Sequence, residues 1–203
     1  MSQPTSSAAP TATKIMLIRH GEKPPSNPPP HGVDINGDHD SESLIVEGWQ
    51  RAGALVVLFA PSVGPFQNSR IATPATIYAS QTGKGSESER PQETVTPLIA
   101  KLGSGNVTQN FDFPKGQEHD VASSAMACDG VVLICWEHQS IPKITKHFPI
   151  SPNNPNKVPT TWPDAPNAPD GRYDIVWVFD WDSTGGYCFY EEPQLLLAGD
   201  TPI

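Results

Sequence analysis

Three residues able to bind an anion or exchange a proton follow apolar runs of the sequence. Arg19 and His20 come directly after the run 15–18, and His138 comes just after the run 131–136. Short apolar runs of this kind are typical of buried strands in a parallel sheet. Because the carboxyl ends of adjacent parallel strands lie side by side, we expect the two histidines to converge.

Arg90 is a fourth candidate, in the segment RPQET at the start of a predicted helix. The unpaired N–H groups of a helix N-terminus and a guanidinium together bind anions well. Taken singly, Arg90 is more simply explained as a solvated loop arginine. Arg19 and His20 are more simply explained as ordinary residues at a strand end, since short motifs are common. Their joint occurrence along one chain favours a shared anion site.

Alternating strands and helices are predicted to position these residues. Their ranges, in chain order, are 14–18, 46–59, 76–80, 95–102, 121–128 and 131–136. Apolar residues at helical spacing define the helices, and Pro97 predicts either a kink or a late start of the second one. A Thr-Gly-Gly turn separates two further predicted strands at 173–179 and 187–197.

This alternation predicts an α/β fold, a three-layer α/β/α sandwich with a mainly parallel sheet. We expect a single domain over 14–203, preceded by a disordered tail over 1–13 that has little to bury. Two loops rich in Pro and Asn, at 24–40 and 151–171, are expected to wall the site.

The composition limits the classes of partner. The chain has 203 residues and a formal net charge of -9, with 13 Lys and Arg against 22 Asp and Glu. A general nucleic-acid binder needs a basic face, so this class is excluded, whereas a local cationic site for one phosphate is not.

Cysteine usage and hydropathy suggest the compartment. Cys128, Cys135 and Cys188 show no metal-ligand spacing, and Cys135 falls in an apolar run as a small core residue. We find no signal peptide and no apolar run long enough to cross a membrane. We therefore expect a cytoplasmic protein with no membrane partner.

The ordered set of motifs resembles the histidine phosphatase superfamily, the phosphoglycerate-mutase-like group with an Arg-His-Gly motif. The matching segments are LIRHGE (17–22), GWQRAGAL (48–55), IYAS (77–80), RPQET (90–94) and VVLICWEHQ (131–139). The closing stretch at 173–200 also resembles the family's terminal pair of strands, so the similarity extends from Lys14 to Asp200. The segment between Ser80 and Arg90 is longer than is usual in the family.

The resemblance implies a role for each of the four candidates. His20 corresponds to the nucleophile that attacks phosphorus and becomes a phosphohistidine, a role that suits an imidazole because its neutral form is nucleophilic near pH 7. Arg19, Arg90 and a protonated His138 are implied to bind the phosphoryl oxygens and to stabilise the charge of the transition state. No metal and no other cofactor is implied.

The proton donor to the leaving alkoxide is the open assignment. In many members it is a Glu between the second Arg and the second His, and that interval holds Asp112, Glu118, His119, Asp120 and Asp129. Glu118 is our first choice, although helix capping is the plainer explanation for Glu118 and Asp120. Glu137 is the rival. It would point away from His138 if the strand continued through both, but not if the strand ended at Trp136.

Other residues near the motifs receive more ordinary expectations. Glu22 and Lys23 are predicted to lie at the pocket rim, and Lys84 in an exposed loop. Trp136 and Trp162 could line a pocket wall, but core packing is the commoner fate of such side chains.

We therefore expect a metal-independent phosphomonoester hydrolase that acts on a small phosphorylated substrate through His20. A phosphomutase of the same superfamily is one alternative, but mutases carry longer insertions, for which this chain has little room. A phosphate- or phosphopeptide-binding module without catalysis is the other, and the long segment between Ser80 and Arg90 favours it.

Overall fold

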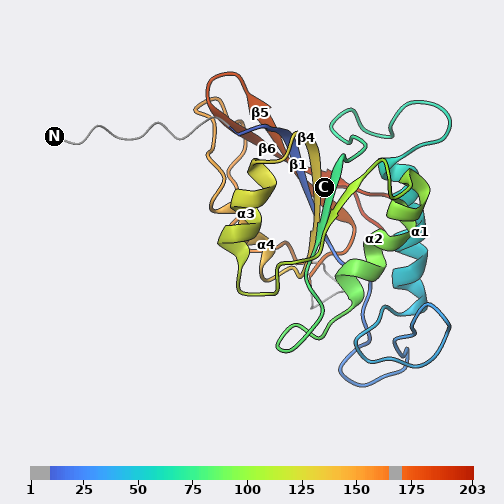
Figure 1. Cartoon of the computed structure of the whole chain (residues 1–203). Coiled ribbons are helices and arrows are strands. Elements are labelled where there is room, and N and C mark those ends of the chain that lie inside the picture. Colours follow the sequence, from blue (N-terminus) through green and yellow to red (C-terminus); the bar gives the residue numbers. More distant parts are fainter. Residues whose placement is uncertain (1–9, 165–170) are drawn as a thin grey trace.

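The computed structural model describes residues 10–164 and 171–203, which form an α/β fold. The strands are β1 (Ala12–Arg19), β2 (Thr76–Ala79), β3 (Thr108–Asn110), β4 (Gly130–Trp136), β5 (Ile175–Asp182) and β6 (Gly186–Pro193). The helices are α1 (Val46–Phe59), α2 (Arg90–Leu102), α3 (Glu118–Met126) and α4 (Ile141–Thr145). Figure 1 shows the sheet between two layers, with α1 and α2 on one face and α3 and α4 on the other.

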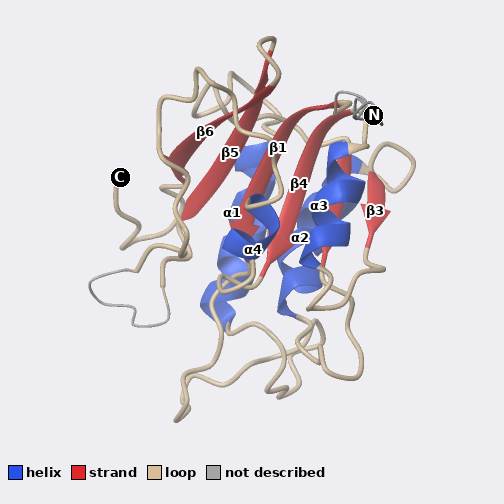
Figure 2. Ribbon diagram, turned by 90° about the vertical axis from the view of Figure 1, so that its left-hand side faces the viewer, coloured by secondary structure: helices blue, strands red, loops and turns tan. Residues whose placement is uncertain are grey.

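The six strands form one mixed, mostly parallel sheet in the order β3-β2-β4-β1-β5-β6 (Figure 2). Strands β1 to β4 run parallel, whereas β5 lies antiparallel to β1, and β6 antiparallel to β5. Arg19 pairs with Trp136, and Cys135 with Ala79, so β1, β4 and β2 end at the same edge. The predicted convergence of the strand ends is therefore confirmed.

Helices on both faces of the sheet explain why its central strands are apolar throughout. Along β1, Ile15 and Leu17 pack in the cluster beneath α3 and α4, whereas Met16 and Ile18 pack in the cluster beneath α1 and α2. Successive side chains of a strand point to opposite faces, and both faces are covered here. Cys135 belongs to one of these clusters, as expected of a small core residue.

Most predicted elements are observed, with shifted ends. The predicted helix 46–59 is observed with the same bounds, and the predicted loop at 24–40 holds no helix or strand, apart from an isolated bridge between Val33 and His39. Helix α2 begins at Arg90 and continues through Pro97, so of the two interpretations of Pro97 the late helix start is wrong. The shortest strand, β3, and the shortest helix, α4, were not predicted: the three residues of β3 are polar, and one turn of helix shows too little periodicity.

The start of β1 lies earlier than the predicted Lys14. Ala12 pairs with Gly130 and is almost fully buried, and Tyr187 donates a hydrogen bond from its hydroxyl to the Ala12 carbonyl at 2.9 Å. Ala12 and Thr13 therefore belong to the strand rather than to the expected tail, while residues 1–9 lie outside the described ranges. The predicted loop at 151–171 has no helix or strand over 151–164, and 165–170 also fall outside those ranges.

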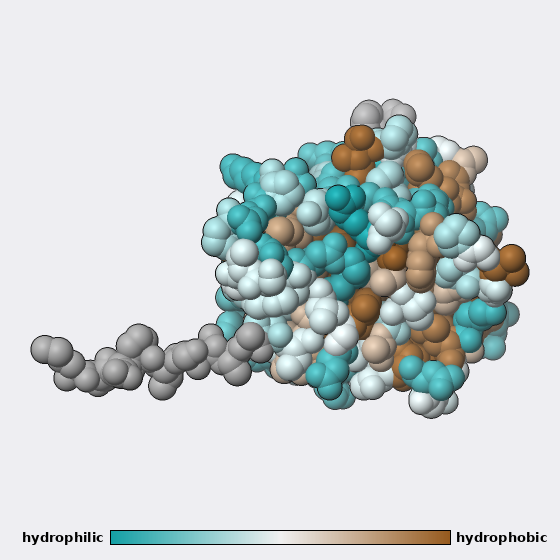
Figure 3. All heavy atoms as spheres, turned by 90° about the horizontal axis from the view of Figure 1, so that it is seen from above, coloured by the Kyte–Doolittle hydropathy of each residue, from teal (hydrophilic) through white to brown (hydrophobic). Residues whose placement is uncertain are grey.

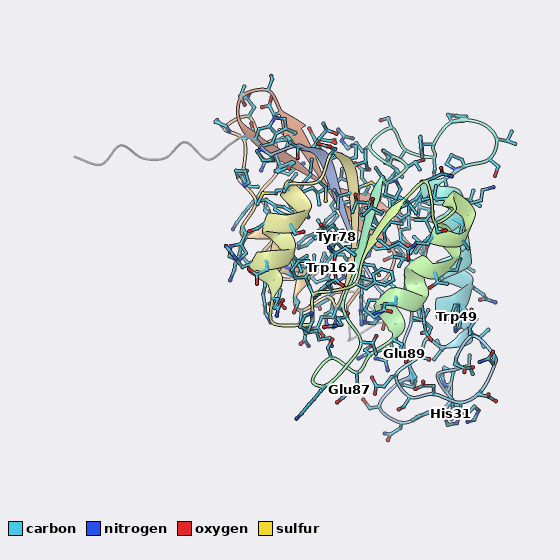
Figure 4. All side chains as sticks on the ribbon, viewed as in Figure 1. His31, Trp49, Tyr78, Glu87, Glu89 and Trp162 are labelled. Atoms are coloured by element: carbon cyan, nitrogen blue, oxygen red, sulfur yellow. The ribbon has the colours of Figure 1, made fainter. Side chains whose placement is uncertain are left out.

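The two ends of the sheet differ in what covers them. In Figure 4, Glu87, Glu89 and His31 lie on the loops below the carboxyl ends of the parallel strands, at the bottom of the view. The opposite end, seen in Figure 3, has hydrophobic residues in several separate groups among hydrophilic ones.

Within the described ranges, no helix has the length and apolar character needed to cross a membrane.

Two glycines let the chain leaving β1 touch the start of α1. A Cβ atom at Gly48 would lie 2.6 Å from the carbonyl oxygen of Glu22, and one at Gly21 would lie 2.9 Å from the carbonyl oxygen of Gly48. The amide of Ile45 also donates to the Glu22 carbonyl at 3.1 Å, which fixes the beginning of α1 against this chain segment. The turn after His20 is thus locked to the helix by direct backbone contact.

We expect Gly48→Ala to lower the free energy of unfolding by about 1–3 kcal/mol, because the new methyl group meets backbone that cannot move aside easily. Gly53 lies in the same helix, and a methyl group added there would meet nothing within 4 Å, so Gly53→Ala is the matched control. That control should gain up to about 1 kcal/mol from helix propensity. Urea denaturation of both variants measures the difference, and equal effects would contradict the close approach at Gly48.

Candidate functional site

A cavity of about 160 Å³ lies at the carboxyl edge of the sheet. Its lining comprises Arg19, His20, Lys23, Ser88, Arg90, Pro91, Lys115, Glu137, His138 and Gln139. Four of these side chains are cationic and one is a carboxylate, although the whole chain carries a net charge of -9. The structure thus brings the four predicted residues Arg19, His20, Arg90 and His138 together in a locally positive cavity.

His20 is held in one orientation and in its neutral form. Its ring Nδ1 lies 2.7 Å from the Gly21 carbonyl oxygen, which can only accept, so Nδ1 carries the proton and Nε2 the lone pair. The side chain is almost fully buried, and burial lowers its pKa most, followed by the charge of Arg19. The pKa therefore lies well below the usual value of 6.5, despite the opposing hydrogen bond to Gly21.

The turn after His20 is tied to helix α2. The amide of Gly21 donates to the Thr94 hydroxyl at 2.8 Å, and that hydroxyl donates to the Arg90 carbonyl at 2.7 Å. The amide of His20 donates to the Trp136 carbonyl at 3.0 Å, which continues the pairing of β1 with β4. These bonds fix the histidine relative to both the strand end and the helix start.

Arg19 is fully buried and is oriented by the segment that precedes β5. Its Nη1 donates to the Gly171 carbonyl at 2.7 Å, and its Nη2 donates to the Tyr173 hydroxyl at 2.9 Å. The guanidinium carbon lies 3.7 Å from the centre of the Tyr173 ring, a cation–π contact. Sequence reasoning missed Tyr173 as a site residue, since a tyrosine near a predicted strand carries no signal for this role.

Arg90 is the first residue of α2 and is oriented by the chain before α1. Its Nε donates to the Ser43 carbonyl at 3.1 Å, its Nη2 donates to the Ser41 carbonyl, and its Nη1 donates to the Ser88 hydroxyl at 3.2 Å. An ion pair with Glu42 at 3.7 Å adds to these contacts. Ser88 shows that the long segment before Arg90 helps to orient it.

Glu137 lies in the cavity beside His138. Strand β4 ends at Trp136, so the alternation that would turn Glu137 away does not apply. Its Oε2 lies 2.6 Å from Lys115 Nζ, and its Oε1 accepts a 2.8 Å hydrogen bond from the Ser140 hydroxyl. Burial raises the pKa of Glu137, but the hydrogen bonds from Lys115 and Ser140 outweigh it, so the pKa is lowered and the group is ionised.

Glu118, our first choice for the proton donor, is not among the residues that line the cavity. It is the first residue of α3, and its Oε1 accepts a 3.1 Å hydrogen bond from the Gly116 amide, a local turn contact. Asp120 is exposed, and its Oδ1 lies 3.1 Å from Nδ1 of the neighbouring His119. Asp112 and Asp129 are exposed and lie outside the lining as well. Sequence position alone suggested Glu118, whereas in the structure it is an acidic residue of the first turn of α3 that contacts the turn before the helix.

Of the remaining expectations for residues near the motifs, most are confirmed and one is wrong. Lys23 lines the cavity as predicted, and Lys84 is exposed and outside it. Trp136 and Trp162 pack in the core, as the commoner fate of such residues suggested. The prediction that Glu22 lies at the rim is wrong, since its carboxylate instead accepts a 2.8 Å hydrogen bond from Arg51.

Comparisons with known proteins add little to this geometry. No protein-family model and no curated protein matches the chain. A search of solved structures finds a likeness to "Mycobacterial hydrolase 2", at 13% sequence identity over 93% of each chain with a TM-score of 0.42. Within residues 10–164 and 171–203, no group of three or more His, Cys, Asp or Glu could hold a metal ion. The case for a function therefore rests on the geometry of the cavity itself.

Proposed function

We propose that the protein is a phosphomonoester hydrolase of the phosphoglycerate-mutase-like histidine phosphatases, acting through a phosphohistidine on His20. One observation carries the proposal: a buried, neutral histidine opens into a cavity with four cationic side chains. A neutral imidazole is nucleophilic, and the cations match the charge of a phosphate ester. Further support comes from the parallel strand ends that bring Arg19, His20 and His138 together, with Arg90 at the start of α2 in the same cavity.

The reaction follows from the orientation of His20. Nε2 attacks phosphorus while the bond between phosphorus and the ester oxygen breaks, and the departing alkoxide takes up a proton. Arg19, Arg90 and His138 bind the phosphoryl oxygens and stabilise the charge spread over them in the transition state. A water molecule then attacks the phosphohistidine, which releases phosphate and regenerates the neutral imidazole.

We assign the proton transfers to Glu137 because it lines the cavity and Glu118 does not. Its carboxylate is ionised in the structure, but a phosphate dianion beside it raises its pKa by like-charge repulsion. Glu137 then donates a proton to the leaving alkoxide and later accepts one from the attacking water. Lys115 and Ser140 orient the carboxylate for both steps.

Glu137→Gln is expected to lower kcat for hydrolysis of an alkyl phosphate by about 10²-fold or more, because an alkoxide leaves poorly without a proton. With p-nitrophenyl phosphate, the rate of the first step, the transfer of the phosphoryl group to His20, should fall much less. Nitrophenolate is a stable anion and can leave without a proton. Glu118→Gln is the matched control and should leave both rates unchanged. Kinetics that show the larger loss for Glu118→Gln would reverse the assignment.

The proposal is tested by trapping the intermediate. The purified protein is mixed with p-nitrophenyl [³²P]phosphate and quenched in alkali, which preserves phosphohistidine, and the labelled peptide is mapped. Label on His20 is expected, together with steady release of nitrophenolate. Phosphate binding without label or turnover would instead identify a phosphate-binding module.

A further inference from the structure

A second cavity, which the proposed reaction does not use, lies beside the first. It has a volume of about 360 Å³ and is formed by α4, the chain after it and the loop at 158–160. Its apolar wall comprises Pro142, Phe148, Ile150, Val158 and Pro159. Cavities of this volume with mostly apolar walls bind small apolar groups.

The two cavities meet on one side along the chain after β4. Gln139 lines both, so the two cavities adjoin at this residue. Lys143 lines the apolar cavity and lies close enough to Glu137 for its charge to act on that carboxylate. Since Glu137 lines the positive cavity, the segment 137–143 forms a shared wall.

A loop joins the two cavities from the other side. Val158 lines the apolar cavity, and the same loop continues to Trp162, whose indole Nε1 donates to the Arg172 carbonyl at 2.7 Å. The Arg172 amide donates back to the Pro163 carbonyl at 2.9 Å. Next to Arg172 in the chain is Gly171, the residue whose carbonyl accepts from Arg19. The loop that walls the apolar cavity is thus hydrogen-bonded to the segment that orients Arg19.

We propose that the apolar cavity binds the alcohol part of the phosphomonoester whose phosphoryl group lies at His20, an assignment that rests on the proposed function. The substrate class is then a phosphate ester of an apolar aliphatic or aromatic alcohol, not of a sugar. Gln139, Lys143, Thr145, Lys146 and Thr160 also line this cavity, but most of its surface is apolar, so sugar hydroxyls placed against it would lose hydrogen bonds to water, which costs free energy. An alkyl or aryl group would instead remove from water its own apolar surface and that of the cavity wall, which is favourable.

Binding of phosphonates, which cannot be hydrolysed, tests the assignment without relying on turnover. By calorimetry, we expect hexylphosphonate to bind at least about tenfold more tightly than methylphosphonate, because its chain reaches the apolar wall. Val158→Asn should remove most of this preference and leave the affinity for methylphosphonate unchanged. Val63→Asn is the matched control, since Val63 is 90% exposed and lines neither cavity.

The outcomes separate this assignment from the proposed reaction. Equal affinity of the wild-type protein for the two phosphonates overturns the assignment, even if His20 becomes labelled in the trapping experiment. A preference for hexylphosphonate that Val158→Asn leaves intact also overturns it. A preference that Val158→Asn removes supports it, and supports it as well if no phosphohistidine forms, in which case only the hydrolase proposal fails.

Discussion

His20→Ala is expected to lower kcat for phosphomonoester hydrolysis by about 10⁴-fold or more, as removal of a covalent nucleophile does in other enzymes. In the proposed reaction the Nε2 of His20 attacks phosphorus, since its Nδ1 lies 2.7 Å from the Gly21 carbonyl oxygen. The cationic side chains remain in the variant, so phosphate should still bind. Initial rates with p-nitrophenyl phosphate and calorimetric titration with phosphate measure the two quantities separately.

His119→Ala is the matched control for this substitution. The His119 side chain is exposed, at 69%, and does not line the cavity, so its loss should leave the rate unchanged. Circular dichroism of both variants establishes that the fold is intact. If His20→Ala retained the wild-type rate, His20 could not be the nucleophile, whatever its position in the cavity.

Arg51→Met is expected to lower the free energy of unfolding by about 3–5 kcal/mol, the cost of leaving buried charges unpaired. Arg51 is almost fully buried, and its guanidinium donates to Glu22 at 2.8 Å, to Asp200 at 2.8 Å and to Gln194 at 3.0 Å. Burial lowers the pKa of Arg51, but the hydrogen bonds to Asp200 and Glu22 outweigh it, so the guanidinium stays charged. Removing it leaves the buried carboxylates of Glu22 and Asp200 without this cationic partner.

The comparison variant for Arg51 is Arg70→Met. Arg70 forms an ion pair with Glu192 at 3.3 Å, but its side chain is 41% exposed, so its loss should cost about 1 kcal/mol or less. Adding Asp200→Asn to Arg51→Met should recover part of the stability, because it removes one of the stranded charges. Urea denaturation measures all three, and a cost of Arg51→Met no larger than that of Arg70→Met would contradict the role given to this network.

Arg51 also shows what a motif match leaves undecided. The segment GWQRAGAL resembles its counterpart in the histidine phosphatases, yet Arg51 lines no part of the positive cavity. It joins Glu22, two residues after His20, to Asp200 near the other end of the chain. Its contribution to the site is indirect, through the chain that follows the nucleophile.

Local patterns in the sequence were enough to predict the central strands and the place of the main site residues. The apolar run 15–18 had to be a strand covered on both faces, and residues that follow such a strand emerge at its carboxyl end. The same argument placed His138 after the run 131–136, and the segment RPQET placed Arg90 at a helix start. These conclusions depend on local periodicity, which a single sequence contains.

Three features of the site could be known only once the chain was folded: which carboxylate faces the cavity, what Arg51 and Glu22 contact, and that Tyr173 holds Arg19. Glu118 and Glu137 are equally plausible as residue types, and the choice between them depends on where β4 ends and how the loop after it folds. Contacts such as that of Arg19 with Tyr173 join residues 154 positions apart. Long-range contacts of this kind follow from the packing of loops around the sheet, which leaves no periodic pattern in the sequence.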